Sequence, residues 1–175
     1  MKRIMLAALA FGLLAMGSYA QDMPKADVAG GYSMLHLNGS GGAPGTNLNG
    51  FGGSATFNAN RWLGVVADFG VYHGSPSGVG LTASTYTFGP RISFRGNSRF
   101  TPFGQALFGG AHLSAVGAST NPFAYSFGGG SDIGISSSGN IALRPQFEYF
   151  GFRSNGATQN AERFSVGIVY HFGSK

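Results

Sequence analysis

With 175 residues, of which 10% are charged, 43% are hydrophobic and 31 are glycine, the chain carries a formal net charge of +5. Its charged fraction is too low for the surface of an ordinary soluble globule. The absence of cysteine excludes a secreted domain held by disulfides and a lipoprotein anchored through a cysteine. After the first three residues, lysine and arginine form no cluster, so the positively charged patch that nucleic-acid binding requires is missing.

The first 20 residues have the pattern of a secretory signal peptide. Lys2–Arg3 precede an apolar segment over 4–16, and small residues follow up to Ala20. This apolar segment is too short to span the roughly 30 Å of a bilayer's hydrocarbon core, so we expect cleavage rather than a retained anchor. The sequence therefore predicts a signal peptide over 1–20 and one mature domain over 21–175, with 9 basic and 6 acidic residues.

The mature chain alternates between turn-forming segments and segments of strand length. Because no later stretch is apolar for long enough to form a transmembrane helix, the exported chain must be soluble or cross a membrane as a closed β-barrel. Three short turns recur at near-regular intervals, as an up-and-down series of hairpins requires. These turns cover residues 58–61, 96–99 and 136–140. Longer polar loops lie between them, at residues 38–47, 73–80, 114–121 and 154–160.

Eight segments remain as expected strands, and each has the about 9–11 residues that a tilted strand needs to span a membrane. They cover residues 27–37, 48–57, 62–72, 81–95, 100–113, 122–135, 141–153 and 161–172. Prolines interrupt three of them, where each removes a backbone donor and is expected to mark a bulge. These prolines are Pro90, Pro102 and Pro145.

Within most of these segments, large apolar residues alternate with polar or small ones. Successive side chains of a strand lie on opposite faces, so one face is apolar and the other carries the charges. An arginine on the lipid face near the midplane would cost about 2–4 kcal/mol, which explains the segregation and favours a barrel in lipid over a soluble sandwich. The expected polar residues of the lumen are Asp68, Arg91, Asp132, Arg144, Gln146 and Glu148. The fifth strand, 100–113, has no clean alternation, so its faces stay unassigned.

Asp132 and Arg144 lie equally far from Ser138 in the last short turn. They are therefore expected to face each other across neighbouring strands and form an ion pair inside the barrel. An eight-stranded barrel is just wide enough for side chains to fill its interior. We expect this polar network to be a structural plug, with a narrow or gated path lined by the same residues as the alternative.

Aromatic residues gather near the strand ends, as in the girdles at the two membrane interfaces. The expected interface aromatics are Trp62, Tyr72, Phe94 and Phe100. The last strand has the cleanest alternation, with an apolar face made of Phe164, Val166, Ile168, Tyr170 and Phe172.

The signal peptide, eight alternating strands, short turns and terminal alternation ending at Phe172 resemble the OmpA-type family of small outer-membrane β-barrels. The resemblance covers the mature chain. It implies an all-β fold, an eight-stranded antiparallel up-and-down transmembrane β-barrel, in the outer membrane of a Gram-negative-type bacterium. It also implies that the terminal apolar face is the signal read by the barrel-assembly machinery, with periplasmic chaperones as partners during biogenesis.

The sequence departs from this family at its end. Family members commonly finish on the terminal Phe, whereas 173–175 follow Phe172 here. No peptidoglycan-binding domain follows the barrel segment in this sequence, so an anchoring role is not implied. With an even number of strands and entry from the periplasm, we expect both termini and the short turns to be periplasmic and the long loops to face outward.

An enzymatic role is not expected. The inward carboxylates are matched by arginines, which is more often structural than catalytic. His36, His73 and His112 lie near outward strand ends, but they come from alternate strands, so we expect interface histidines rather than a metal or catalytic cluster. The spacing of His73 and Ser75 is similar to the His-x-Ser spacing of outer-membrane lipid deacylases, yet no acidic residue lies nearby. No cofactor or metal is predicted.

The sequence thus favours a monomeric integral outer-membrane protein, in contact with lipid, with a structural or surface-interaction role. Two alternatives stay open: a narrow porin-like channel for small solutes, and a secreted soluble β-protein.

Overall fold

The structure is a computed structural model that describes residues 23–39, 44–75, 78–96, 99–115, 117–154 and 156–173. The expected signal peptide, 1–20, lies outside the described residues. Across the described ranges, no helix is long and apolar enough to cross a membrane.

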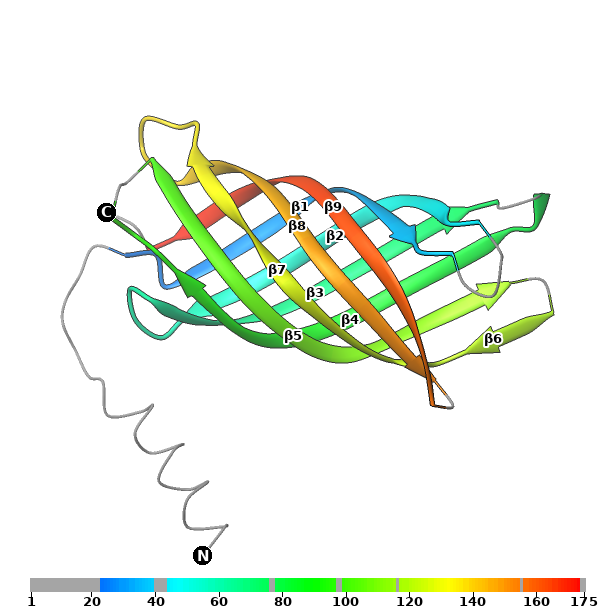
Figure 1. Ribbon diagram of the computed structural model, residues 1–175. Coiled ribbons are helices and arrows are strands. Elements are labelled where there is room, and N and C mark those ends of the chain that lie inside the picture. Colours follow the sequence, from blue (N-terminus) through cyan, green and yellow to red (C-terminus); the bar gives the residue numbers. More distant parts are fainter. Residues whose placement is uncertain are drawn as a thin grey trace, which may run out of the picture.

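Eight long strands form a closed antiparallel barrel, as the sequence predicted (Figure 1). Each long strand pairs with the next along the chain, and pairings of β1 with β9 and β4 with β5 complete the ring. The short β6 pairs only with the end of β5, so it extends one hairpin rather than adding a wall strand. The strands in the described residues are β1 Ala26–Leu37, β2 Thr46–Asn58, β3 Leu63–Gly74, β4 Leu81–Ser93, β5 Phe100–Ala115, β6 Ala118–Thr120, β7 Phe123–Gly134, β8 Ile141–Ser154 and β9 Ala157–Phe172.

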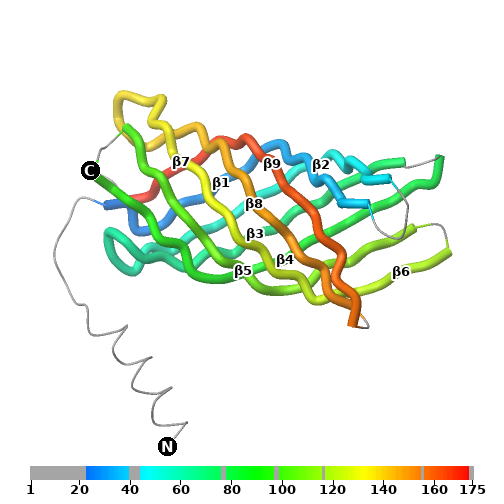
Figure 2. The backbone as a smooth tube through the Cα atoms, in the orientation of Figure 1, coloured from blue at the N-terminus to red at the C-terminus, as the bar shows by residue number. Residues whose placement is uncertain are grey.

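The first and last strands lie side by side, and Ala26 is paired with Phe172. The beginning of β1 and the end of β9 therefore share one end of the barrel with the short turns (Figure 2). The longer connections, including the β5–β6 extension, lie at the opposite end.

The three strand prolines do not mark bulges, so that expectation is wrong. The pairing register is the same on both sides of Pro90, Pro102 and Pro145. Instead, the β4–β5 ladder skips the pairs of Gly89 and Pro90, and the β7–β8 ladder skips those of Pro145 and Arg144. A missing backbone N–H thus removes local pairing, while the pairs on either side hold the register.

The outer surface is apolar because large apolar side chains recur at the outward positions of the strands. Val65 and Phe69 are 56% and 61% exposed, whereas Asp68 between them is 5% exposed. Trp62, Phe94 and Phe100 lie on the outer face near the short-turn end, and the Trp62 and Phe94 rings meet edge to face, 5.9 Å apart. Most charged side chains of the strands correspondingly point into the lumen.

Tyr72 is not an interface aromatic, and its place in the expected girdle is wrong. Its exposure is 0%, because it shares the inward face of β3 with Asp68 and Gly70. Its ring lies over Gly70, where any larger side chain would collide with it. The alternation of side chains along β3 therefore predicts the burial of Tyr72 correctly, whereas its position near a strand end does not.

Candidate functional site

The barrel interior holds nearly all the charged side chains of the described strands, arranged in layers. The layers are named here from the short-turn end: the mouth network, the Asp132–Arg144 pair, the central band and the apolar cluster. Each is built from inward positions on several strands.

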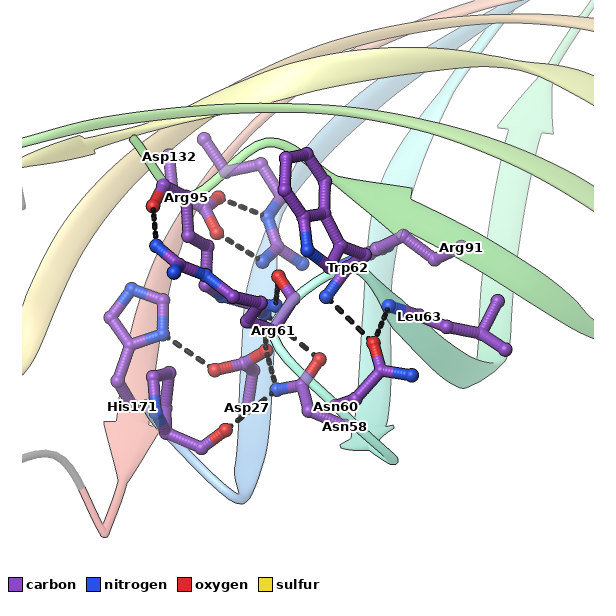
Figure 3. Close-up of polar contacts among 12 residues, drawn as sticks. Asp27, Asn58, Asn60, Arg61, Trp62, Leu63, Arg91, Arg95, Asp132 and His171 are labelled. Atoms are coloured by element: carbon purple, nitrogen blue, oxygen red, sulfur yellow. Dashed lines mark hydrogen bonds and ion pairs between the residues drawn. The ribbon is translucent and has the colours of Figure 1, made fainter. Parts of the chain in front are cut away.

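The mouth network surrounds Asp27, near the start of β1 (Figure 3). Its carboxylate lies 2.5 Å from Nδ1 of His171 and accepts a 2.9 Å hydrogen bond from Nδ2 of Asn58. Arg95, just beyond β4, lies 3.8 Å from the same carboxylate and donates to Asn58. Burial lowers the pKa of the Arg95 guanidinium, and Asp27 opposes that effect.

Arg95 also joins two short turns. It donates through Nη1 to the Arg61 carbonyl at 3.0 Å, and Arg61 donates through Nη2 to the Arg95 carbonyl at 3.2 Å. The β2–β3 turn is thereby fastened to the end of β4 at this mouth.

Asp132 and Arg144 form a bidentate ion pair between β7 and β8. Arg144 donates through Nε and Nη2 to the two carboxylate oxygens, at 2.6 and 2.8 Å. The Arg144 guanidinium also lies 4.9 Å from the centre of the Phe103 ring, and that of Arg91 lies 4.2 Å from it. One inward aromatic ring thus makes cation–π contacts with two arginines.

The central band crosses the lumen. Arg163 of β9 donates through Nη1 to Asp68 of β3 at 2.7 Å and pairs through Nη2 with Glu148 of β8. Glu148 also accepts from Gln105 at 2.8 Å, and Gln105 in turn accepts from Arg91 at 2.8 Å. Five strands are connected by this chain of buried side chains.

Gln146 joins the same band by donating to Glu148 at 2.8 Å. All six expected lumen residues therefore face the interior, but they fall into two layers rather than one network. Arg163 and Gln105 also belong to the central band and were not among the predicted lumen residues. The alternation along β9 was enough to predict Arg163 as an inward residue. Gln105 could not be predicted in this way, because the inward face of its strand also carries the apolar Phe103 and Leu107.

The apolar cluster fills the lumen toward the long-loop end. The Phe150 and Phe152 rings stack with centres 5.7 Å apart, and the guanidinium of Arg163 lies 4.9 Å from the Phe150 ring. The hydroxyl of Tyr72 accepts a hydrogen bond from Arg163 at 3.1 Å, so the apolar cluster is in direct contact with the central band. Its buried members are Leu35, Leu48, Tyr72, Ala83, Ala111, Ala124, Phe150, Phe152 and Ala161.

A small cavity of about 40 Å³ lies inside the wall formed by β1, β2 and β9. Asp68, Arg144, Gln146 and Arg163 contribute to its lining, together with strand glycines. Such a volume holds about one or two water molecules and no larger solute. Among the described residues, Nη1 of Arg144 and Nε of Arg163 have no protein hydrogen-bond partner, so water is the fitting occupant.

The three histidines of the long-loop end lie outside the lumen. Their Nδ1 atoms lie 2.5 Å from Asn47 for His36, 2.9 Å from Thr82 for His73 and 2.7 Å from Asn121 for His112. Within the part of the chain that the structure describes, no three His, Cys, Asp or Glu residues are grouped as a metal site would require.

The terminal apolar face of β9 lies on the barrel exterior. Its side chains are 44–52% exposed, and the Tyr170 and Phe172 rings meet with centres 4.6 Å apart. The residues are Phe164, Val166, Ile168, Tyr170 and Phe172.

The comparisons with known proteins agree with this architecture. A model of the outer membrane protein beta-barrel domain matches residues 6–172. Neisserial surface protein A superposes with a TM-score of 0.68 at 15% identity, over 85% of this chain and 97% of that chain. The attachment invasion locus protein Ail of Yersinia pestis superposes with a TM-score of 0.61 at 19% identity, over 86% and 99%.

OprG from Pseudomonas aeruginosa superposes with a TM-score of 0.61 at 10% identity, over 86% of this chain and 97% of that chain. A search of curated proteins found no match. At these identities the solved structures are evidence for the fold, while the family model covers almost the whole sequence. This chain therefore belongs to the outer membrane protein beta-barrel domain family and is an integral β-barrel of the outer membrane.

Proposed function

We propose that the protein is a closed barrel with a structural or surface-interaction role in the outer membrane, and neither a channel nor an enzyme. The observation that carries this proposal is the contact of Arg163 with Asp68 across the lumen, covered by the stacked Phe150 and Phe152 rings. Removing one partner of a buried ion pair costs about 3–5 kcal/mol. A spontaneous opening that separates these partners is therefore rare.

The apolar cluster is the stronger argument against a channel. An ion crossing it would lose its hydration without gaining a polar wall, and apolar constrictions close pores in this way. The polar layers on their own would favour the narrow-channel alternative, since arginines and carboxylates line the mouth and the middle of the barrel. The buried rings beyond them favour the plug.

The long-loop end is the surface that we assign to interactions outside the cell. Both termini would then be periplasmic. An even number of wall strands and the presence of the short turns beside the β1–β9 ends support this orientation. The segments that the sequence assigns to long loops, 38–47, 73–80, 114–121 and 154–160, carry no Asp, Glu, Lys or Arg, although strands extend into all four of them. A partner would therefore meet a polar but uncharged surface at this end.

Biogenesis and oligomeric state follow from the same exterior. We assign the exposed face from Phe164 to Phe172 to recognition by the barrel-assembly machinery after delivery by periplasmic chaperones. A monomer suits a barrel whose exterior is apolar around its circumference, because lipid covers that surface fully.

Conductance in planar bilayers tests the closed lumen. Purified protein is expected to give no steady unitary current, with a porin in the same bilayer as the positive control. Asp132→Ala and Arg144→Ala are expected to stay silent as well, because neither change removes the apolar cluster. Steady channels of the wild type would overturn the plug, and current in the variants alone would assign a gate to the Asp132–Arg144 pair.

A further inference from the structure

A groove of about 590 Å³ crosses the outer face of four neighbouring strands, β1, β9, β8 and β7. The pairing register places Met34, Phe164 and Phe147 in one row across the first three of these strands. Gly129 continues this row on β7, and a Cβ there would collide with the backbone carbonyl of Phe103. The groove thus runs from large apolar side chains to a position that must stay without a side chain.

The groove lies within the lipid-facing band of the barrel. On β7, its residue Ser131 shares the outward face with Phe127 and Ile133, both of which are exposed. On β9, Phe164 and Val166 line the groove and are half exposed. The groove is therefore continuous with the apolar surface that lipid covers, and its volume lies within the range of about 300–1,000 Å³ that is usual for small-molecule sites.

Ser131 lacks one backbone hydrogen bond at this groove. Just beyond β7, Ile135 donates its backbone N–H to the Ile141 carbonyl at 3.0 Å, and hydrogen-bonded pairs recur at every second residue of an antiparallel ladder. The register on either side makes Ser131 and Pro145 such a pair, but proline has no N–H to donate. The Ser131 carbonyl therefore has no donor on β8, which explains why the β7–β8 ladder skips this pair.

Ser131 also brings a hydroxyl to this place. Its side chain lies on the outward face, because the next residue, Asp132, points into the lumen. A hydroxyl on a ligand is both a donor and an acceptor, so it can donate to the unpaired Ser131 carbonyl and accept from the Ser131 side chain. Backbone groups without a partner are costly in hydrocarbon, so a ligand that supplies this donor is favoured over one that does not.

We propose that the groove binds a hydroxylated fatty acyl chain of a membrane lipid. The hydroxyl sits at Ser131, beside Pro145, and the hydrocarbon lies against Phe147 and Phe164. A chain without a hydroxyl covers the same apolar surface but leaves the Ser131 carbonyl unpaired. A second barrel brings a convex wall, which bridges the groove rather than filling it. The site lies within the membrane band, so the proposal is independent of which end of the barrel faces outward.

Competition between two lipids that differ by a single hydroxyl tests the site. The purified barrel is placed in nanodiscs with equal amounts of stearoyl and hydroxystearoyl phosphatidylcholine, with the hydroxyl near the headgroup or in mid-chain in separate samples. After transfer to detergent, mass spectrometry identifies the lipid that stays with the barrel. We expect one of the hydroxylated lipids to be retained at least about fivefold over the stearoyl lipid, because hydrogen bonds distinguish the two. Equal retention at both hydroxyl positions would overturn the proposal.

Two proline variants locate this preference. Pro145→Ala restores the N–H that the Ser131 carbonyl lacks, so the preference for the hydroxylated lipid should disappear while the barrel keeps its fold. Pro102→Ala is the matched control, because Phe94 donates to the Pro102 carbonyl at 2.8 Å, so the N–H restored there faces the β4 side rather than the groove. A preference that survives in Pro145→Ala, or one that is lost in Pro102→Ala, would contradict the site.

A third variant and an NMR signal test the site without a proline change. Ser131→Phe fills the β7 end of the groove and should reduce the retention of both lipids, with heat-dependent electrophoretic mobility as the check that the barrel is folded. The Asp132 amide belongs to the same peptide unit as the Ser131 carbonyl, so its signal in the wild type should shift with the hydroxylated lipid only. Full retention by Ser131→Phe, or an Asp132 signal that responds equally to both lipids, would overturn the proposal.

Discussion

Arg163 and Asp68 are 95 residues apart in the sequence and form a 2.7 Å hydrogen bond inside the barrel. Their strands, β9 and β3, are separated by two others in the sheet order, so the bond crosses the lumen rather than joining neighbours. The same guanidinium also pairs with Glu148. One arginine thereby links opposite walls and blocks the passage between them.

Replacing Arg163 is expected to destabilise the barrel strongly. Arg163→Met leaves Asp68 and Glu148 buried without their cation, and such a loss costs about 3–5 kcal/mol. Urea unfolding in lipid vesicles measures the free energy. Arg153→Met, on the exposed rim, is the matched control and should change it by less than about 0.5 kcal/mol. Equal effects of the two changes would show that the cross-lumen contact contributes nothing special.

The Asp132–Arg144 pair is expected to couple energetically. In a double-mutant cycle with Asp132→Ala and Arg144→Ala, the interaction energy should lie in the range of about 0.5–3 kcal/mol found for contacting residues. A second cycle that combines Asp132→Ala with Arg163→Ala is the control, because the structure describes no contact between those two side chains. A coupling as small as that control's would argue against the bidentate geometry.

The stacked rings of the apolar cluster predict a contrast between two kinds of phenylalanine. Phe150→Ala removes a side chain that is 0% exposed in the lumen, and such truncations cost about 3–5 kcal/mol. Phe127→Ala removes a lipid-facing side chain that is 48% exposed, and lipid fills part of the space left behind. The Phe150 variant should therefore unfold at clearly lower urea, and the reverse order would refute an interior cluster.

Two neighbouring glycines on β1 provide a test of barrel closure. A Cβ on Gly31 would collide with the backbone carbonyl of Val166 on β9, whereas one on Gly30 would come no closer than 3.9 Å to the Gly52 oxygen. Gly31→Ala is therefore expected to weaken the β1–β9 seam and Gly30→Ala to leave it intact. The compact, unheated band on an electrophoresis gel reports closure, and an unaffected Gly31→Ala barrel would mean that the seam has room to adapt.

The alternation along each strand was sufficient to predict a lipid-embedded eight-stranded barrel and to assign Asp68, Arg144 and Glu148 to its interior. This information is local, because successive side chains of a strand face opposite sides whatever its partners are. The Asp132–Arg144 contact was also within reach, since a short turn sets the register of its two strands.

Contacts across the lumen were beyond that reasoning. Which inward groups meet depends on how the strands tilt and how the ring closes, and no pattern within one strand encodes this. The partnership of Arg163 with Asp68 and the placement of Tyr72 and Phe150 in one apolar cluster are therefore decided by the closed barrel. The aromatic ring of Tyr72 could be mistaken for an interface residue for the same reason: its position near a strand end is local, whereas the apolar cluster that buries it is assembled from strands distant in the sequence.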